Sequence, residues 1–171
     1  MLVIVGGTKD ELGGSEYYEY IHNSIGGKSP FVDMKFAKQS QQIILELIDQ
    51  ELVNSVHDCS KGGLAVAVSE LCIKNEMGCV VSIDKIPSQK LKPDEIMFSE
   101  SHSRYLLVID QKNSGKIKSM LKQKNISYAL IGKFSGSSII FRNKTKTIVN
   151  LRIDKAQDKW LNSVESLVTH G

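Results

Sequence analysis

The fold is decided by one stretch, His57-Asp58-Cys59-Ser60-Lys61-Gly62-Gly63-Leu64-Ala65-Val66-Ala67-Val68-Ser69-Glu70. It begins at the end of an apolar run, 52–57, that predicts a strand, passes a pair of glycines and enters a helix predicted over 64–75. That helix is small and apolar almost all round, which predicts a central, buried position. A strand-to-helix turn presents backbone N–H groups at a helix N-terminus, so the turn is also a candidate anion site.

The turn has two interpretations. As a ligand site, its glycines allow positive φ and close approach of a ligand oxygen, while Ser60 donates a hydroxyl and Asp58 accepts from a ribose. As a purely structural turn, Ser60 is the N-cap of the helix and Asp58 is a local acceptor. Spacing alone favours the structural interpretation, because short glycine motifs are weak signals.

Two further polar clusters have the same character. Gly13-Gly14-Ser15-Glu16 opens a helix predicted over 16–24, where Ser15 and Glu16 either cap the helix or contact a ligand. Ser99-Glu100-Ser101-His102-Ser103-Arg104 precedes a strand. Glu100 and Arg104 either form an ion pair that fixes the turn, or Arg104 binds a phosphate or carboxylate with its planar fork. The residues alone leave both alternatives open.

Outward from these clusters the chain alternates between strands and helices. The order of the elements predicts an α/β (α+β) fold with helices packed on a mixed sheet. Apolar runs predict further strands at 2–5, 79–83, 105–109, 129–131, 138–141 and 147–151, with Gly132 and Gly136 at turns. Helical spacing predicts a helix after the cap Asp33, a short one after Asp94, one at 114–124, and one at 154–168 anchored by Trp160, Leu161, Val164, Leu167 and Val168.

Composition excludes several classes of function. The 171 residues suit a single domain, 1–171, and the net charge of +3 is dispersed without the basic block that nucleic-acid binding needs. No apolar run approaches the roughly 20 residues of a membrane span. Three cysteines without C-x-x-C spacing indicate reduced core thiols, so we expect a cytoplasmic protein.

Metal and acid–base chemistry within this chain are not predicted. The four histidines show no metal-ligand spacing. His57 and Asp58 are neighbours on a strand, where side chains point to opposite faces, so we expect no direct pair. We therefore expect no catalytic residue and no metal ligand in this chain.

Three segments in this order closely resemble one known family: Gly7-Thr8-Lys9-Asp10-Glu11-Leu12-Gly13-Gly14-Ser15-Glu16, then His57 to Ala67, then Met97-Phe98-Ser99-Glu100-Ser101-His102-Ser103-Arg104. The resemblance is to the C-terminal part of phosphoribosylformylglycinamidine synthases, in the aminoimidazole ribonucleotide synthetase superfamily. It covers essentially the whole chain. It implies a three-layer α/β/α domain around a mixed sheet, like the C-terminal domain of aminoimidazole ribonucleotide synthetase.

The resemblance also implies a function. The family's ATP-dependent C–N ligase converts formylglycinamide ribonucleotide to formylglycinamidine ribonucleotide in purine biosynthesis, using ATP, Mg²⁺ and ammonia from a glutaminase. It implies a piece of a larger synthetase, inactive alone and binding neither cofactor tightly, with the remaining domains, a glutaminase subunit and a small accessory subunit as partners. By resemblance, a phosphate, auxiliary nucleotide or interface site comprises Gly13, Gly14, Ser15, Glu16, Asp58, Ser60, Gly62, Gly63, Ser99, Glu100, Ser101 and Arg104.

Two alternatives remain. The chain could be a stand-alone regulatory module of the same superfamily that binds a nucleotide or phosphate. It could also belong to another ligase of the superfamily, such as aminoimidazole ribonucleotide synthetase, although the segment Glu11-Leu12-Gly13-Gly14-Ser15-Glu16 favours the amidine-forming family.

Overall fold

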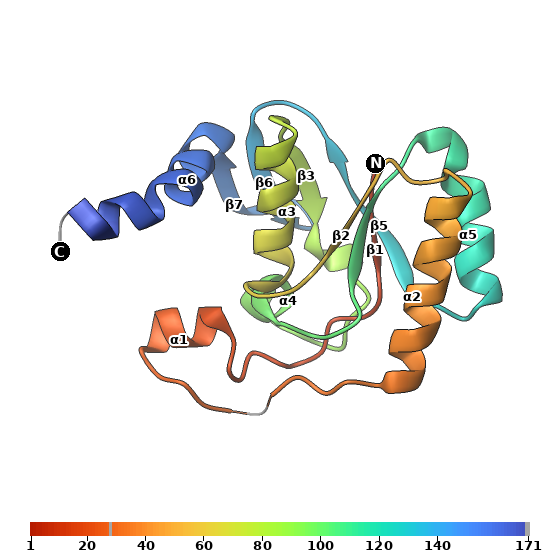
Figure 1. The fold of residues 1–171 in the computed structure, drawn as a ribbon, viewed down its shortest axis with the longest axis horizontal. Helices are drawn as coiled ribbons and strands as arrows, with labels where there is room; N and C mark the ends of the chain where they lie inside the picture. Colours follow the sequence, from red (N-terminus) through yellow and green to blue (C-terminus); the bar gives the residue numbers. More distant parts are fainter. Residues whose placement is uncertain (28, 170–171) are drawn as a thin grey trace.

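The structure, a computed structural model, describes residues 1–27 and 29–169, and its centre is a seven-stranded mixed sheet (Figure 1). Among the strands of the described residues, β3 and β6 run parallel, and the other neighbouring strands of the sheet are antiparallel. The strands are, in sheet order, β2 (Ser55–Asp58), β4 (Tyr105–Val108), β1 (Leu2–Val5), β5 (Tyr128–Phe134), β3 (Cys79–Ser82), β6 (Ser138–Asn143) and β7 (Lys146–Arg152).

Helices cover both faces of the sheet, which gives the three layers that the resemblance implies. Successive side chains of β1 point to opposite faces, so Leu2 and Ile4 join one core while Val3 and Val5 join the other. The first core lies under α3 (Gly63–Lys74), α4 (Pro93–Phe98) and the first turn of α6 (Ile153–Thr169). The second lies under α2 (Met34–Asp49) and α5 (Ser114–Gln123). The short α1 (Glu16–His22) lies to one side of these layers, and two short 3-10 turns, η1 (Ile83–Lys85) and η2 (Gln111–Asn113), complete the elements (Figure 1).

The predicted helices and strands are present, and α3 has the central, buried position that its apolar composition predicts. The side chains of α3 that face the sheet are buried, including Leu64, Val68 and Leu71. Asp33 caps α2 by accepting from the Phe36 N–H at 3.0 Å. Cys59, Cys72 and Cys79 are buried free thiols, as predicted. Within the described residues, no helix has the length and apolar character that crossing a membrane requires.

Two sequence predictions about strands are wrong. The strand predicted at 52–57 begins only at Ser55, because Glu51 adopts a left-handed conformation and the Leu52 N–H bonds back to the Leu47 carbonyl, which closes α2. Gly132 is not in a turn but within β5, where an added Cβ would lie 2.5 Å from the Val80 carbonyl oxygen of the neighbouring strand. The close approach of the two strands explains the glycine.

The predicted anchors of the last helix, α6, are also wrong in part. Trp160 and Leu161 were predicted to anchor α6, but they are 52% and 63% exposed, and the helix packs on the core through Ile153 and Ala156. Val164, Leu167 and Val168 lie outside the residues whose side chains are described. On α1, Tyr20 is 88% exposed, and contact with the body is made by Tyr17, whose ring stacks on Phe98 at 4.4 Å.

Candidate functional site

Glu100 joins the three polar clusters. Its Oε1 accepts from the Gly62 N–H at 2.9 Å, at the start of α3, and from the Glu16 N–H at 3.0 Å, at the start of α1. The carboxylate therefore lies where both helix N-termini present N–H donors, which is the position an external anion would take. This chain supplies that anion itself.

The Gly62-Gly63 turn is shaped around the same segment. Gly62 is the N-cap of α3 and carries no side-chain cap, so the structural interpretation of Ser60 as N-cap is wrong. The Ser60 hydroxyl donates instead to the Asp58 carboxylate. Gly63 has φ +63°, and a Cβ there would lie 2.5 Å from the Ser99 carbonyl oxygen. Only glycine therefore lets α3 start so close to the Ser99–Glu100 backbone.

Arg104 is buried and hydrogen-bonds the loops around it. Its guanidinium donates to the Ser101 carbonyl at 2.9 Å, to the Thr8 hydroxyl at 3.0 Å and to the Ser99 carbonyl. Among the described residues no ion pair joins it to Glu100, because the two side chains bond different backbone segments. Burial lowers the pKa of Arg104, and nearby charges, including Glu11 and Glu100, oppose that shift.

The serines of the third cluster bind the first loop. Ser99 Oγ donates to the Lys9 carbonyl at 2.7 Å and accepts from the Glu11 N–H at 3.2 Å, while Ser101 Oγ accepts from the Lys9 N–H at 3.0 Å. Ser99 and Ser101 are both buried. Their hydroxyls are therefore used in holding the loop in place and do not face solvent.

The Gly13-Gly14-Ser15-Glu16 cluster has a capping role in the structure. Ser15 is buried and accepts from the Tyr18 N–H at 3.1 Å, as an N-cap does. The Gly14 N–H donates to the Gly26 carbonyl at 2.8 Å, and Gly13 packs against Gly27. The Glu16 side chain points outward and pairs with Lys61 at 2.5 Å, a contact that raises the pKa of Lys61.

Sequence reasoning missed Glu11. This residue is 9% exposed, and its Oε1 accepts from the Phe31 N–H at 2.9 Å, which ties the segment before α2 to the first loop. Its Oε2 is buried and has no hydrogen-bond partner among residues 1–27 and 29–169. An acidic residue beside the glycine pair was visible in the sequence, but no local pattern marks it as buried.

An open cavity of about 590 Å³ lies beside the turn. Lys38 and Gln41 of α2 line one side, and Asp58, Ser60 and Lys61 line the other. Apolar atoms of Val32, Met34 and Ala37 form part of the wall. The cavity thus offers one apolar wall and polar groups of both signs, which suits a polar organic ligand better than a bare anion.

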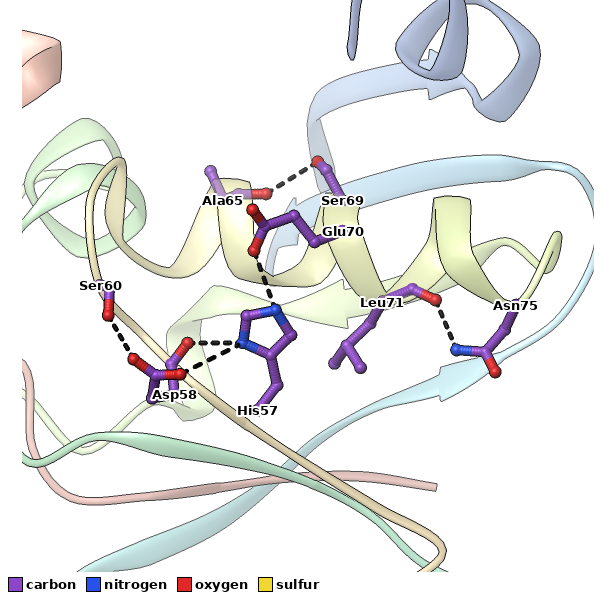
Figure 2. Close-up of polar contacts among 8 residues, drawn as sticks. All are labelled: His57, Asp58, Ser60, Ala65, Ser69, Glu70, Leu71 and Asn75. Atoms are coloured by element: carbon purple, nitrogen blue, oxygen red, sulfur yellow. Dashed lines mark hydrogen bonds and ion pairs between the residues drawn. The ribbon is translucent and has the colours of Figure 1, made fainter. Parts of the chain in front are cut away.

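His57 links the edge strand to α3 (Figure 2). Its Nε2 lies 2.9 Å from Glu70 Oε2, and its Nδ1 lies 2.7 Å from the Asp58 carbonyl oxygen and 4.0 Å from Asp58 Oδ1. The expectation that the His57 and Asp58 side chains make no direct pair is wrong at the end of β2, because Nδ1 lies 4.0 Å from Asp58 Oδ1. The ion pair between His57 on β2 and Glu70 on α3 was not predicted.

Cys59 is not a nucleophile at neutral pH. The side chain is buried between the turn and Arg104, and burial raises the pKa of its thiol to about 11. The thiol is therefore protonated at neutral pH. It serves as a core residue beneath the exposed side chains of Asp58 and Ser60.

The described residues do not fit a magnesium–triphosphate group at the turn. Among them, no set of three or more His, Cys, Asp or Glu side chains is placed to hold a metal ion. The N–H donor of Gly62, which a phosphate would use, is taken by the Glu100 carboxylate. A phosphate at that position would meet a like charge.

Comparisons with known proteins agree on the family. Residues 1–142 match the family "AIR synthase related protein, C-terminal domain". The subunit PurL of phosphoribosylformylglycinamidine synthase from Thermococcus sibiricus is 38% identical over 169 residues, and that from Methanococcus aeolicus is 33% identical over 168 residues. Each alignment covers 98% of this chain, which spans only 23% and 22% of these curated relatives.

Solved structures show the same fold. The chain is similar to Thermotoga maritima PurL complexed with FGAR, with a TM-score of 0.82 and 18% identity over 91% of this chain and 27% of that one. It is also similar to the hydrogenase maturation protein HypE of E. coli, with a TM-score of 0.61 and 15% identity over 89% of this chain and 48% of that one. One fold therefore serves proteins with different names and roles, and the fold alone does not identify the reaction. By its sequence match over residues 1–142, the chain belongs to the family of AIR synthase related proteins, C-terminal domain.

Proposed function

We propose that residues 1–171 form a single C-terminal domain of a phosphoribosylformylglycinamidine synthase, the ATP-dependent ligase that forms formylglycinamidine ribonucleotide in purine biosynthesis. The observation that carries this proposal is the 38% identity to a PurL subunit across 98% of the chain. It is supported by the way Glu100 and Arg104 hold the three family-like segments in one place.

The site we propose has two layers. The inner layer, which shapes the loops, consists of buried or hydrogen-bonded groups: Gly13, Gly14, Ser15, Gly62, Gly63, Ser99, Glu100, Ser101 and Arg104. The outer layer consists of Glu16, Asp58 and Ser60, which are exposed and lie with Lys61 at or beside the cavity. An auxiliary nucleotide or another domain would contact the outer layer together with Glu100 and Arg104, which also line the cavity.

The catalytic steps belong to other parts of the synthetase in this proposal. ATP and Mg²⁺ are held by domains outside this chain, consistent with the lack of fit at the turn. The remaining domains, a glutaminase subunit and a small accessory subunit are the proposed partners, and the cytoplasm is the proposed location. The isolated chain is expected to have no ligase activity.

The test is to purify the longest synthetase polypeptide that carries this sequence and to measure ATP-dependent formation of the amidine product from formylglycinamide ribonucleotide and ammonia. Deleting residues 1–171 is expected to abolish product formation, while Met77→Ser, at an exposed apolar position, leaves it unchanged. Full activity after the deletion would reject a required role for this domain.

A second candidate is a stand-alone module that binds a nucleotide or phosphate. The cavity of about 590 Å³, flanked by Lys38 and Lys61, favours it. Calorimetry of the isolated chain with ATP, ADP and formylglycinamide ribonucleotide separates the two. Micromolar binding that is lost in Lys61→Ala but retained in the distant Lys146→Ala supports the module, whereas absence of binding supports the ligase domain.

A further inference from the structure

Six large apolar side chains are exposed on α1, on the segment that follows it and at the start of α2. We call them the apolar arm: Tyr20 (88% exposed), Ile21 (53%), Ile25 (77%), Phe31 (69%), Val32 (37%) and Met34 (75%). In Figure 1, α1 and the start of α2 lie along the same lower side of the molecule, away from α6. Clustered exposure of this kind marks an interaction surface, unlike single exposed apolar residues.

The inner side of the arm is fixed to the body of the domain. Tyr17 stacks on Phe98 at 4.4 Å, the Phe31 N–H donates to Glu11 at 2.9 Å, and the Gly14 N–H donates to Gly26 at 2.8 Å. The backbone that presents the exposed side chains is therefore held before any partner binds. Such preorganisation reduces the entropy cost of association.

The arm is continuous with the candidate site. Val32 and Met34 belong to the arm and also line the cavity beside Asp58 and Ser60. A protein surface that contacts Val32 and Met34 would therefore also lie next to the polar side chains of the cavity.

We infer that the apolar arm is the docking surface for another domain of the same synthetase, one that presents a mainly apolar face. The inference rests on the proposed function, and its occupant is argued from size: the chain spans 22–23% of its curated relatives, so more than three quarters of such a protein lies outside it. Aromatic side chains at the centre of a buried contact carry much of the binding energy, so Tyr20 and Phe31 are the expected anchors.

Site-specific photo-crosslinking in the source cell tests this without depending on activity. A photoreactive phenylalanine (p-benzoylphenylalanine) replaces Tyr20 or Phe31, both aromatic already, and crosslinked peptides are identified by mass spectrometry. The matched controls carry it at Leu45 or Met77, which are 58% and 47% exposed and lie outside the arm. Thermal unfolding of each purified variant is expected to match that of the parent, because the replaced side chains are 47–88% exposed and the aromatic replacement of Phe31 keeps a ring near Lys9 Nζ, which lies 5.6 Å from the Phe31 ring centroid.

The expected result is crosslinking from Tyr20 and Phe31, several-fold above the controls, to sequence that aligns with the part of the Thermococcus sibiricus relative not covered by this chain. Crosslinks to residues 1–171 of a second copy, to an unrelated protein or at control yield would overturn the inference. The two proposals fail in different assays, because crosslinking reports contact and not activity. If the ligase proposal is wrong, the activity assay shows no product. If this inference is wrong, the enzyme is active but Tyr20 and Phe31 give no crosslinks above the controls.

Discussion

Replacing Glu100 tests whether its carboxylate is the internal anion of the site. Glu100→Ala removes the acceptor of two backbone N–H groups, of which Gly62 is buried and Glu16 is exposed. Water replaces the bond to Glu16 readily but the one to Gly62 only in part, because Gly62 is buried although Glu100 lines the open cavity. A lost hydrogen bond to a charged group costs about 1.5–3 kcal/mol, and loss of the negative charge beside two helix N-termini adds a fraction of this. We expect a loss of about 2–3 kcal/mol.

Glu100→Gln isolates the charge, because the amide oxygen still accepts both N–H groups. Its cost should be smaller, about 1 kcal/mol. The assay is urea unfolding at neutral pH, with Asp49→Asn as the control: Asp49 is an exposed carboxylate at the C-terminus of α2, where losing a negative charge does not destabilise the helix.

A second measurement asks whether the vacated position takes an anion. Inorganic phosphate at about 100 mM should raise the Tm of Glu100→Ala more than that of the parent, since binding to the folded state stabilises it by mass action. If Glu100→Ala unfolds within about 0.5 kcal/mol of the parent, or if phosphate stabilises both proteins equally, the carboxylate does not have this role.

Three further predictions address the supporting residues. Burial raises the pKa of the Cys59 thiol from 9.0 in the unfolded chain to about 11 in the folded one. The free energy of unfolding therefore has its full contribution from this thiol below pH 9 and loses up to about 2.7 kcal/mol as the pH rises through 11. Cys59→Ala should flatten that part of the plot of unfolding free energy against pH. Arg104→Ala, measured by urea unfolding, should cost about 3–5 kcal/mol because buried carbonyls lose their donors, and Arg104→Lys, with a different donor geometry, should recover only part of it. Gly63→Ala should cost clearly more than Gly14→Ala in the same assay: both have positive φ, of +63° and +70°, but only at Gly63 does a Cβ collide, 2.5 Å from the Ser99 carbonyl oxygen.

The layers of the fold could be predicted because apolar runs and helical stripes report burial directly. The all-apolar run of β1 predicts a buried strand, and the small apolar residues of α3 predict a buried helix. What failed depended on distant contacts. Nothing near Gly132 in sequence shows that the Val80 backbone of β3 presses against it, and nothing near Trp160 shows that α6 packs through its first turn instead.

The sequence predicts which residues form the candidate site better than it predicts the hydrogen bonds between them. Ser15 capping α1 follows from local chemistry, since the acceptor and its N–H are three residues apart. Glu100 receiving the Gly62 N–H does not, because the two groups are 38 residues apart and meet only through the pairing of β2 with β4. The same separation hides the burial of Arg104, whose partner Thr8 is 96 residues away.

Buried and exposed residues alternate along the polar clusters, and this limits what a match to their sequence can say about ligands. Cys59 lies buried between exposed Asp58 and Ser60, and buried Ser101 precedes exposed His102. A change to a buried member alters the loops that carry the site, whereas a change to an exposed member alters what the cavity can bind while the fold stays the same. Ligand specificity must therefore be sought in the exposed side chains beside the cavity, such as Asp58 and Lys61. Substituting Asp58 or Lys61 is thus a sharper test of ligand binding than substituting any glycine of the turn.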